Sequence, residues 1–247
     1  MKAFLKKEAP LFVPSSLMFL IALMMLEMIM FFGVVLKNKG LVSTLIYMFL
    51  FTTVIMVVML LAGAGKALLT HLRDENYYSV WKAQGDTALT LFGKLTGLYT
   101  VILFALTGLY LLAFGLDVLW SSVAFPEEKE GLSKLWDMLF PGPNGAAAVA
   151  ATVLEFMMIA FLFTALTFFA VTMAYNLFTK TRYAGFLGAV FFAIFAYTIV
   201  KINVQVLSSL GTVTYHLASA GFCAVCGIVL SAVAYGSIRK REWNSDK

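Results

Sequence analysis

Residues 15–36 of the chain read SSLMFLIALMMLEMIMFFGVVL, an apolar run that contains a single charged residue, Glu27. A bilayer core about 30 Å thick requires about 20 apolar residues per helix, so this run is long enough to cross a membrane. It is also longer than the roughly 7–15 apolar residues of a signal-peptide core, and we expect no cleavage after it. The run therefore predicts a first transmembrane helix that remains in the protein.

Five further apolar runs follow, separated by polar breaks. They predict transmembrane helices at residues 41–61, 95–116, 146–175, 185–202 and 211–235. The 247 residues are 62% hydrophobic and 13% charged, whereas a soluble domain is roughly 45–50% apolar. We therefore predict an all-α, polytopic membrane protein with about six transmembrane helices, which form a single transmembrane domain over residues 1–247.

The distribution of lysine and arginine predicts how these helices are oriented, because cytoplasmic loops are enriched in both residues. With the N-terminus inside, thirteen of the eighteen basic residues lie on the cytoplasmic side, and six spans bring the tail at residues 237–247 back to that side. The inner residues are Lys2, Lys6, Lys7, Lys66, Arg73, Lys82, Lys94, Lys180, Arg182, Arg239, Lys240, Arg241 and Lys247. The net charge of +5 is thus explained by basic residues on the cytoplasmic side of the membrane. We therefore expect no nucleic-acid partner.

Three segments are not needed to cross the membrane. Residues 1–14 begin with apolar residues set among lysines and predict a short amphipathic helix in the headgroup layer. Residues 117–145 are expected to form an extracellular loop with an amphipathic helix from Pro126 to Phe140. Residues 64–94 are expected to form the longest cytoplasmic segment.

That cytoplasmic segment combines charges with aromatic side chains. Its candidate contact residues are Asp74, Glu75, Tyr77, Tyr78 and Trp81. Aromatic residues with a charged rim are typical of protein interfaces, and a loop between adjacent helices needs only a few residues. The segment therefore predicts contact with another protein; a belt of aromatic residues at the membrane surface remains the alternative.

Several kinds of catalytic site are missing from the sequence. Residues 63–66, Gly-Ala-Gly-Lys, lack the first glycine and the following hydroxyl of a phosphate-binding loop. His71 and His216 are predicted on opposite sides of the membrane, so they cannot bind one haem. Cys223 and Cys226 lie within an apolar helix and are expected to pack there. We therefore expect no enzyme activity, no metal site and no cofactor bound by this chain.

Two acidic residues lie inside predicted helices, Glu27 in the first and Glu155 in the fourth. A charged side chain at mid-bilayer costs about 2.5–3.5 kcal/mol on insertion scales, so each should face protein or a water-filled path and not lipid. Methionines, which adapt to irregular ligands, lie near Glu27 at Met24 and Met28. These four residues are candidates for a substrate path. A protonated carboxyl that cross-links two helices is the alternative for both acids.

The order of these parts resembles the permease subunits of bacterial ABC-2 type exporters. The similarity covers nearly the whole chain and is carried by the basic start, the two spans, Asp74-Glu75-Asn76-Tyr77-Tyr78, the later Leu89-Thr90-Leu91-Phe92-Gly93-Lys94, four more spans and Ser237-Ile238-Arg239-Lys240-Arg241. Asn76 and Tyr78 stand where many members have Gly and Leu, and Gln84-Gly85 replaces a Leu-Pro turn.

The resemblance implies a partner and an energy source. In that family the segment after the second helix is a coupling helix seated in a separate ATPase subunit, which binds ATP and Mg²⁺. Two permease subunits, here expected to be identical, face each other in the bacterial inner membrane. The expected function is export of an amphipathic substrate, such as a cationic peptide or a lipid-like molecule. The alternatives are a secondary carrier that uses Glu27 and Glu155 as proton or cation sites, and a membrane scaffold or immunity protein that transports nothing.

Overall fold

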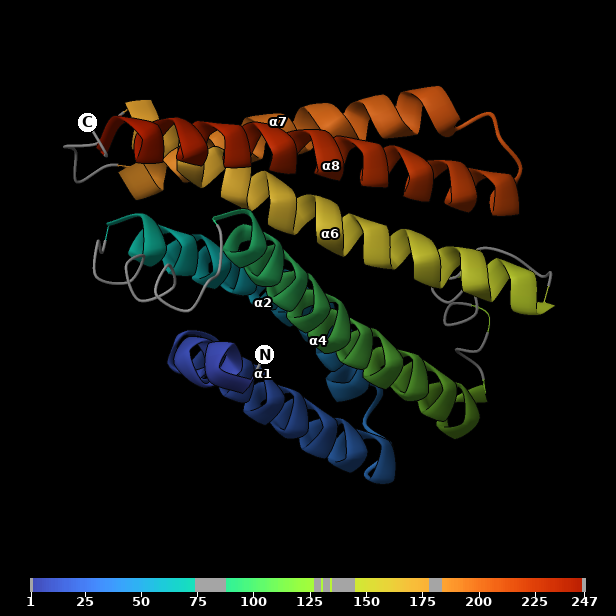
Figure 1. The fold of residues 1–247 in the computed structure, drawn as a ribbon. Helices are drawn as coiled ribbons and strands as arrows, with labels where there is room; N and C mark the ends of the chain where they lie inside the picture. Colours follow the sequence, from blue (N-terminus) through green and yellow to red (C-terminus); the bar gives the residue numbers. More distant parts are fainter. Residues whose placement is uncertain are drawn as a thin grey trace. The chain divides into compact units, whose positions relative to one another are not determined.

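The computed structural model describes residues 2–73, 88–126, 130, 134, 145–177 and 184–245, and nearly all of them are helical (Figure 1). The helices are α1 (Lys2–Val35), α2 (Lys39–Arg73), α4 (Ala88–Ala124), α6 (Gly145–Leu177), α7 (Ala184–Leu207) and α8 (Thr212–Ser245). Each contains an apolar span of 23 to 36 residues, long enough to cross a bilayer. The predicted all-α fold with six spans is thus confirmed, and the chain is a multi-pass membrane protein. The positions of its termini remain a prediction.

Two of the helices extend further than the sequence predicted. α2 continues to Arg73 and α4 begins at Ala88, so helix occupies much of the predicted cytoplasmic segment at residues 64–94. Residues 74–87, between these two helices in the sequence, lie outside the described residues. At its other end α4 continues to Ala124, seven residues beyond Asp117. The expectation that the extracellular loop begins at Asp117 was wrong, because one acid on a packed face does not interrupt a helix whose following residues are apolar.

The N-terminal segment is part of α1 and is not a separate helix. α1 runs without interruption from Lys2 to Val35 and includes Pro10 and Pro14. Proline cannot donate a backbone hydrogen bond and tends to bend a helix, and the ribbon of α1 turns near its N-terminal end (Figure 1). Most of the predicted outer helix at residues 126–140 lies outside the described residues. Glu130 and Lys134 are helical, and their side chains form an ion pair at 2.9 Å.

The chain divides into two compact units, and each unit is assembled from separate stretches of sequence. Unit 1 comprises Met1–Leu60 and Leu103–Val149, and unit 2 comprises Leu61–Ile102 and Ala150–Lys247. The boundary between them falls inside α2, α4 and α6. Each of these three helices therefore contributes one part to unit 1 and the other part to unit 2.

The core of unit 1 forms where α1, α2 and α4 present residues at intervals of three and four. On α4 these residues are Leu103, Thr107, Tyr110, Phe114, Asp117, Val118 and Ser121. Residues with this spacing lie on one face of a helix, so α4 offers a continuous stripe to its neighbours. Tyr110 is completely buried, packs against Phe49 of α2, and its hydroxyl donates to the carbonyl oxygen of Phe19 on α1 at 2.6 Å. This residue joins all three helices.

The core of unit 2 is built around α6, the most deeply buried of the six spans. Small residues allow neighbouring helices to approach it closely, which is how helices commonly associate in membranes. A Cβ atom at Gly65 of α2 would lie 3.1 Å from Val171 of α6. A Cβ atom at Gly227 of α8 would lie only 2.5 Å from Cε1 of Phe161. The α6–α8 contact therefore depends on the absence of a side chain at Gly227.

α7 and α8 run side by side and are joined by a short turn after Leu207 (Figure 1). Asn203, predicted to lie in the break between the last two spans, is instead inside α7. Its amide nitrogen donates to Oγ of Ser219 on α8 at 3.0 Å, and both side chains are buried. Apart from such contacts α7 is mostly exposed in the structure. In a membrane this apolar surface faces lipid or another protein.

Candidate functional site

Glu27 lies within α1 on the flank that packs in unit 1. The buried residues of this helix are Phe19, Leu23, Leu26, Met30 and Val34, and Glu27 falls within their three-and-four spacing. Its side chain is partly buried, and Oε1 is enclosed with no hydrogen-bond partner among the described residues. The prediction that Glu27 faces protein and not lipid is consistent with this position.

The partner of Glu27 is Asp117 of α4, with which it shares a side-chain hydrogen bond. Asp117 is 7% exposed and continues the stripe of buried residues on α4. A hydrogen bond between two carboxyl groups requires a proton on one of them, because ionised carboxylates only accept. Two adjacent negative charges in an apolar setting would also repel strongly. The pair therefore needs at least one proton and carries at most one negative charge.

This carboxyl pair lines an open groove between α1 and α4 with a volume of about 750 Å³. The other lining residues are apolar or aromatic: Met30, Phe31, Val34, Leu116, Leu119, Trp120, Val123 and Ala124. The rings of Phe31 and Trp120 meet edge to face, with centroids 6.4 Å apart. Small-molecule sites are typically apolar with a few polar groups that fix orientation. The groove has this composition, and a single acidic pair provides its polarity.

The methionines predicted to accompany Glu27 are not part of this groove. Met24 and Met28 are among the most exposed residues of α1, at 70% and 61%, and neither lines it. Met24 lies two helical turns before Phe31 on the same side of the helix, but the groove is lined from Glu27 onward. In a membrane both methionines face lipid or another protein.

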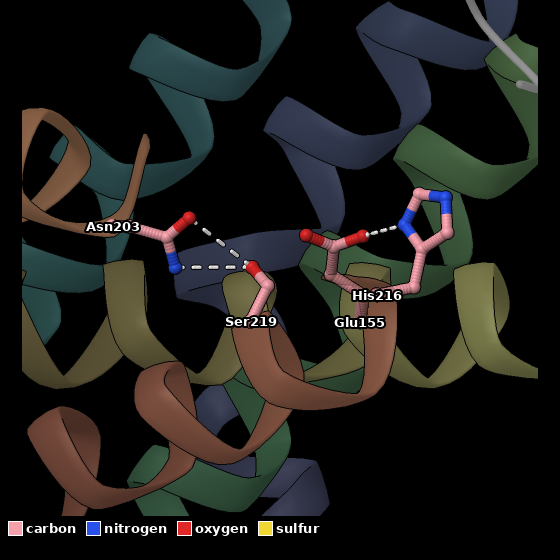
Figure 2. A network of polar contacts seen from close by, with 4 residues as sticks. All are labelled: Glu155, Asn203, His216 and Ser219. Atoms are coloured by element: carbon pink, nitrogen blue, oxygen red, sulfur yellow. Dashed lines mark hydrogen bonds and ion pairs between the residues drawn. The ribbon is translucent and has the colours of Figure 1, made fainter. Parts of the chain in front are cut away.

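Glu155 on α6 has a different partner in unit 2. Its carboxylate forms an ion-pair contact with Nδ1 of His216 on α8, and Figure 2 shows the two side chains turned toward each other. The side chains are 12% and 8% exposed. Asn203 and Ser219 form a second polar pair in the same region (Figure 2). The two predicted intramembrane acids thus have separate partners.

Comparisons with known protein families, with curated proteins and with solved structures find no match. The candidate site therefore rests on the geometry and chemistry of the residues described above. Among the described part of the chain, no group of three or more His, Cys, Asp or Glu side chains is arranged to hold a metal ion.

The residues predicted to contact an ATPase lie outside the described residues. These are Asp74, Glu75, Tyr77, Tyr78 and Trp81. The structure describes the helices on either side, α2 up to Arg73 and α4 from Ala88. The assignment of this segment as a coupling helix stays a prediction.

Sequence reasoning identified one member of each polar pair and missed the other. Asp117 was assigned to a loop, although the spacing from Thr107 through Tyr110 and Phe114 to Asp117 is a signal that could have placed it on the packed face. His216 was considered only as a haem ligand. A contact across 61 residues leaves no mark in local periodicity.

Proposed function

We propose that the chain is a membrane permease that binds an amphipathic, cationic substrate in the groove between α1 and α4. The supporting observation is the Glu27–Asp117 pair, two hydrogen-bonded carboxyl groups set in an otherwise apolar groove of about 750 Å³. An alkyl chain or apolar side chain would contact Phe31 and Trp120, while an amine would contact the carboxylates. Trp and Phe faces also attract cations.

The proposed source of energy is a separate ATPase subunit. This part of the proposal rests on the resemblance of residues 74–94 and of the whole order of spans to ABC-2 type exporters. Residues 74–81 would contact the ATPase, and α2 and α4, which flank that segment, would carry its movement into the membrane as rigid bodies. The permease would act as a dimer in the bacterial inner membrane.

Binding at the groove can be measured through Trp120. The chain has four tryptophans, and replacing the other three with phenylalanine leaves Trp120 as the only indole. In nanodiscs, a bromoalkylamine is expected to quench its fluorescence at about tenfold lower concentration than the matching bromoalkanol, a difference of about 1.4 kcal/mol. The physical reason is that both probes have the same apolar contacts and only the amine meets the carboxylates.

The matched variants separate charge from shape. Glu27→Gln with Asp117→Asn keeps the size of both side chains and is expected to remove the advantage of the amine. Glu130→Gln, which neutralises an exposed acid outside the groove, should leave it unchanged. Equal quenching by the amine and the alcohol in the parent protein would disprove the groove as a cation site.

The ATPase partner can be tested independently of the substrate. A tagged chain purified from its native membrane is expected to carry vanadate-sensitive ATP hydrolysis, and deletion of residues 74–81 should reduce that co-purified activity at least tenfold. Tyr47→Ala, at an exposed position elsewhere on α2, is the control and should retain it. If the deletion variant retains full ATPase activity, the coupling assignment is wrong.

A secondary carrier is the second candidate, favoured by the proton that a hydrogen bond between the Glu27 and Asp117 carboxyls requires. A shared proton can be exchanged for a cation without any ATPase. This alternative predicts substrate movement in proteoliposomes containing the chain alone and driven by a pH gradient. The exporter proposal predicts no movement under those conditions.

A further inference from the structure

The Glu155–His216 pair is a buried ionisable contact that substrate binding at the α1–α4 groove does not use. It joins α6 to α8, and its side chains are 12% and 8% exposed. Placing ionisable side chains inside a membrane span costs free energy, and such residues commonly have a function. Packing alone would be served as well by apolar residues of similar size.

The hydrogen bond between the two residues determines where the protons are. An ionised carboxylate can only accept, so with Glu155 ionised the hydrogen bond requires the proton on Nδ1 of His216, which donates to it. The neutral ring then has Nε2 as its basic atom. Nε2 is buried and has no hydrogen-bond partner among the described residues, and Figure 2 shows it on the side of the ring away from Glu155. A carboxylate that orients a histidine in this way is the usual arrangement for a proton acceptor.

His216 lies close to the beginning of the apolar span of α8. The apolar span of α8 begins at Val213, so His216 lies about 4.5 Å along the helix from that end, at roughly 1.5 Å per residue. The turn that follows Leu207 lies just before it. His216 therefore lies near one end of this span and not at its middle.

The surroundings of the pair are polar but contain few other ionisable groups. Tyr215 and Cys223 of α8 interact electrostatically with Glu155, and the ring of Tyr215 packs against His216 edge to face. From α7 the neutral Asn203 bonds to Ser219, three residues after His216. No basic side chain of the described residues forms an ion pair with Glu155 other than His216.

We propose that the Glu155–His216 pair is a proton-binding site. The lone pair of Nε2 forms an N–H bond with a proton supplied by water, and no bond of the protein breaks. The pair changes from one net negative charge to neutral, with an imidazolium held against a carboxylate. This inference goes beyond the proposed function, because neither cation binding at Glu27 nor contact with an ATPase requires it.

The experiment uses the full chain in nanodiscs with ¹⁵N-labelled histidine. The protein has two histidines, so the His71→Gln variant leaves the two nitrogens of His216 as the only signals. At pH 8 we expect Nδ1 protonated and Nε2 bare. When the pH is lowered from 8 to 5, Nε2 should gain a proton while Nδ1 keeps its own.

Two variants test the role of the carboxylate. Glu155→Leu removes the acceptor and should convert the neutral ring at pH 8 to a mixture of tautomers. Ser219→Ala changes the neighbouring polar pair and should leave the Nδ1–H tautomer in place. The inference is overturned if Nε2 stays bare down to pH 5, or if Nε2 carries the proton already at pH 8. These signals require neither substrate nor ATPase, so they are independent of the test at Trp120.

Discussion

Replacing Gly227 with valine should lower the free energy of unfolding of the unit that contains α6 and α8 by about 1–3 kcal/mol. A Cβ at this position would lie 2.5 Å and 2.7 Å from two atoms of the Phe161 ring. No packed carbon pair adopts such distances, so α8 must move away from α6 or Phe161 must leave its place. The two methyl groups of valine add to the overlap, and they also restrict its side-chain rotamers in a helix.

The control for this prediction lies on the same helix. A Cβ at Gly221 meets nothing within 4 Å, so Gly221→Val changes helix propensity without overlap and should alter stability by only a few tenths of a kcal/mol. Unfolding of both variants in mixed detergent micelles, followed by circular dichroism, gives the comparison. Equal stability of the two variants would show that the α6–α8 contact is looser than described.

Charge reversal at Glu27 should abolish transport of a cationic substrate and spare a neutral one. Two unit charges 4 Å apart interact by about 4 kcal/mol at an effective dielectric constant of 20, so exchanging attraction for repulsion can cost two or more powers of ten in affinity. We expect Glu27→Lys to reduce ATP-driven accumulation of a cationic amphipathic peptide in inside-out vesicles about 100-fold. Its neutral analogue should be reduced less than threefold.

A second lysine variant controls for the insertion of a charge into α1. Met18 is exposed and lies nine residues before Glu27, on the opposite side of the helix. Met18→Lys should therefore leave accumulation of the cationic peptide within a factor of three. A similar loss of both peptides in Glu27→Lys would identify Glu27 as a structural residue and would contradict the groove as a substrate site.

The sequence was sufficient for the number of spans because hydrophobic length is a local property. Six runs of about 20 apolar residues can be recognised without knowing which helices touch. The ends of the helices were harder to place. Asp117 is a charged residue inside α4 that was read as the start of a loop, and α2 extends to Arg73 through residues that were also read as a loop. A charge marks a helix end only where that helix meets water.

The candidate site depended on contacts that the sequence does not reveal. Glu27 and Glu155 were identified from the cost of placing a charge in a membrane, and this reasoning needs no knowledge of neighbours. Their partners, Asp117 and His216, follow from which helix faces lie together. For Asp117, the three-and-four spacing of buried residues on α4 indicates that it lies on the packed face of that helix. For His216 no pattern within α8 distinguishes a partner of α6 from any other buried polar residue.

The division of the chain into units has a consequence for how the protein is made. Unit 1 needs residues up to Val149, and unit 2 needs a stretch that begins at Leu61 and another that ends at Lys247. No continuous gene fragment therefore encodes either unit alone. During synthesis the second half of α2 leaves the ribosome before α6, against which Gly65 packs, exists. Until then, Gly65 and the face around it have to be sheltered by lipid or by the insertion machinery.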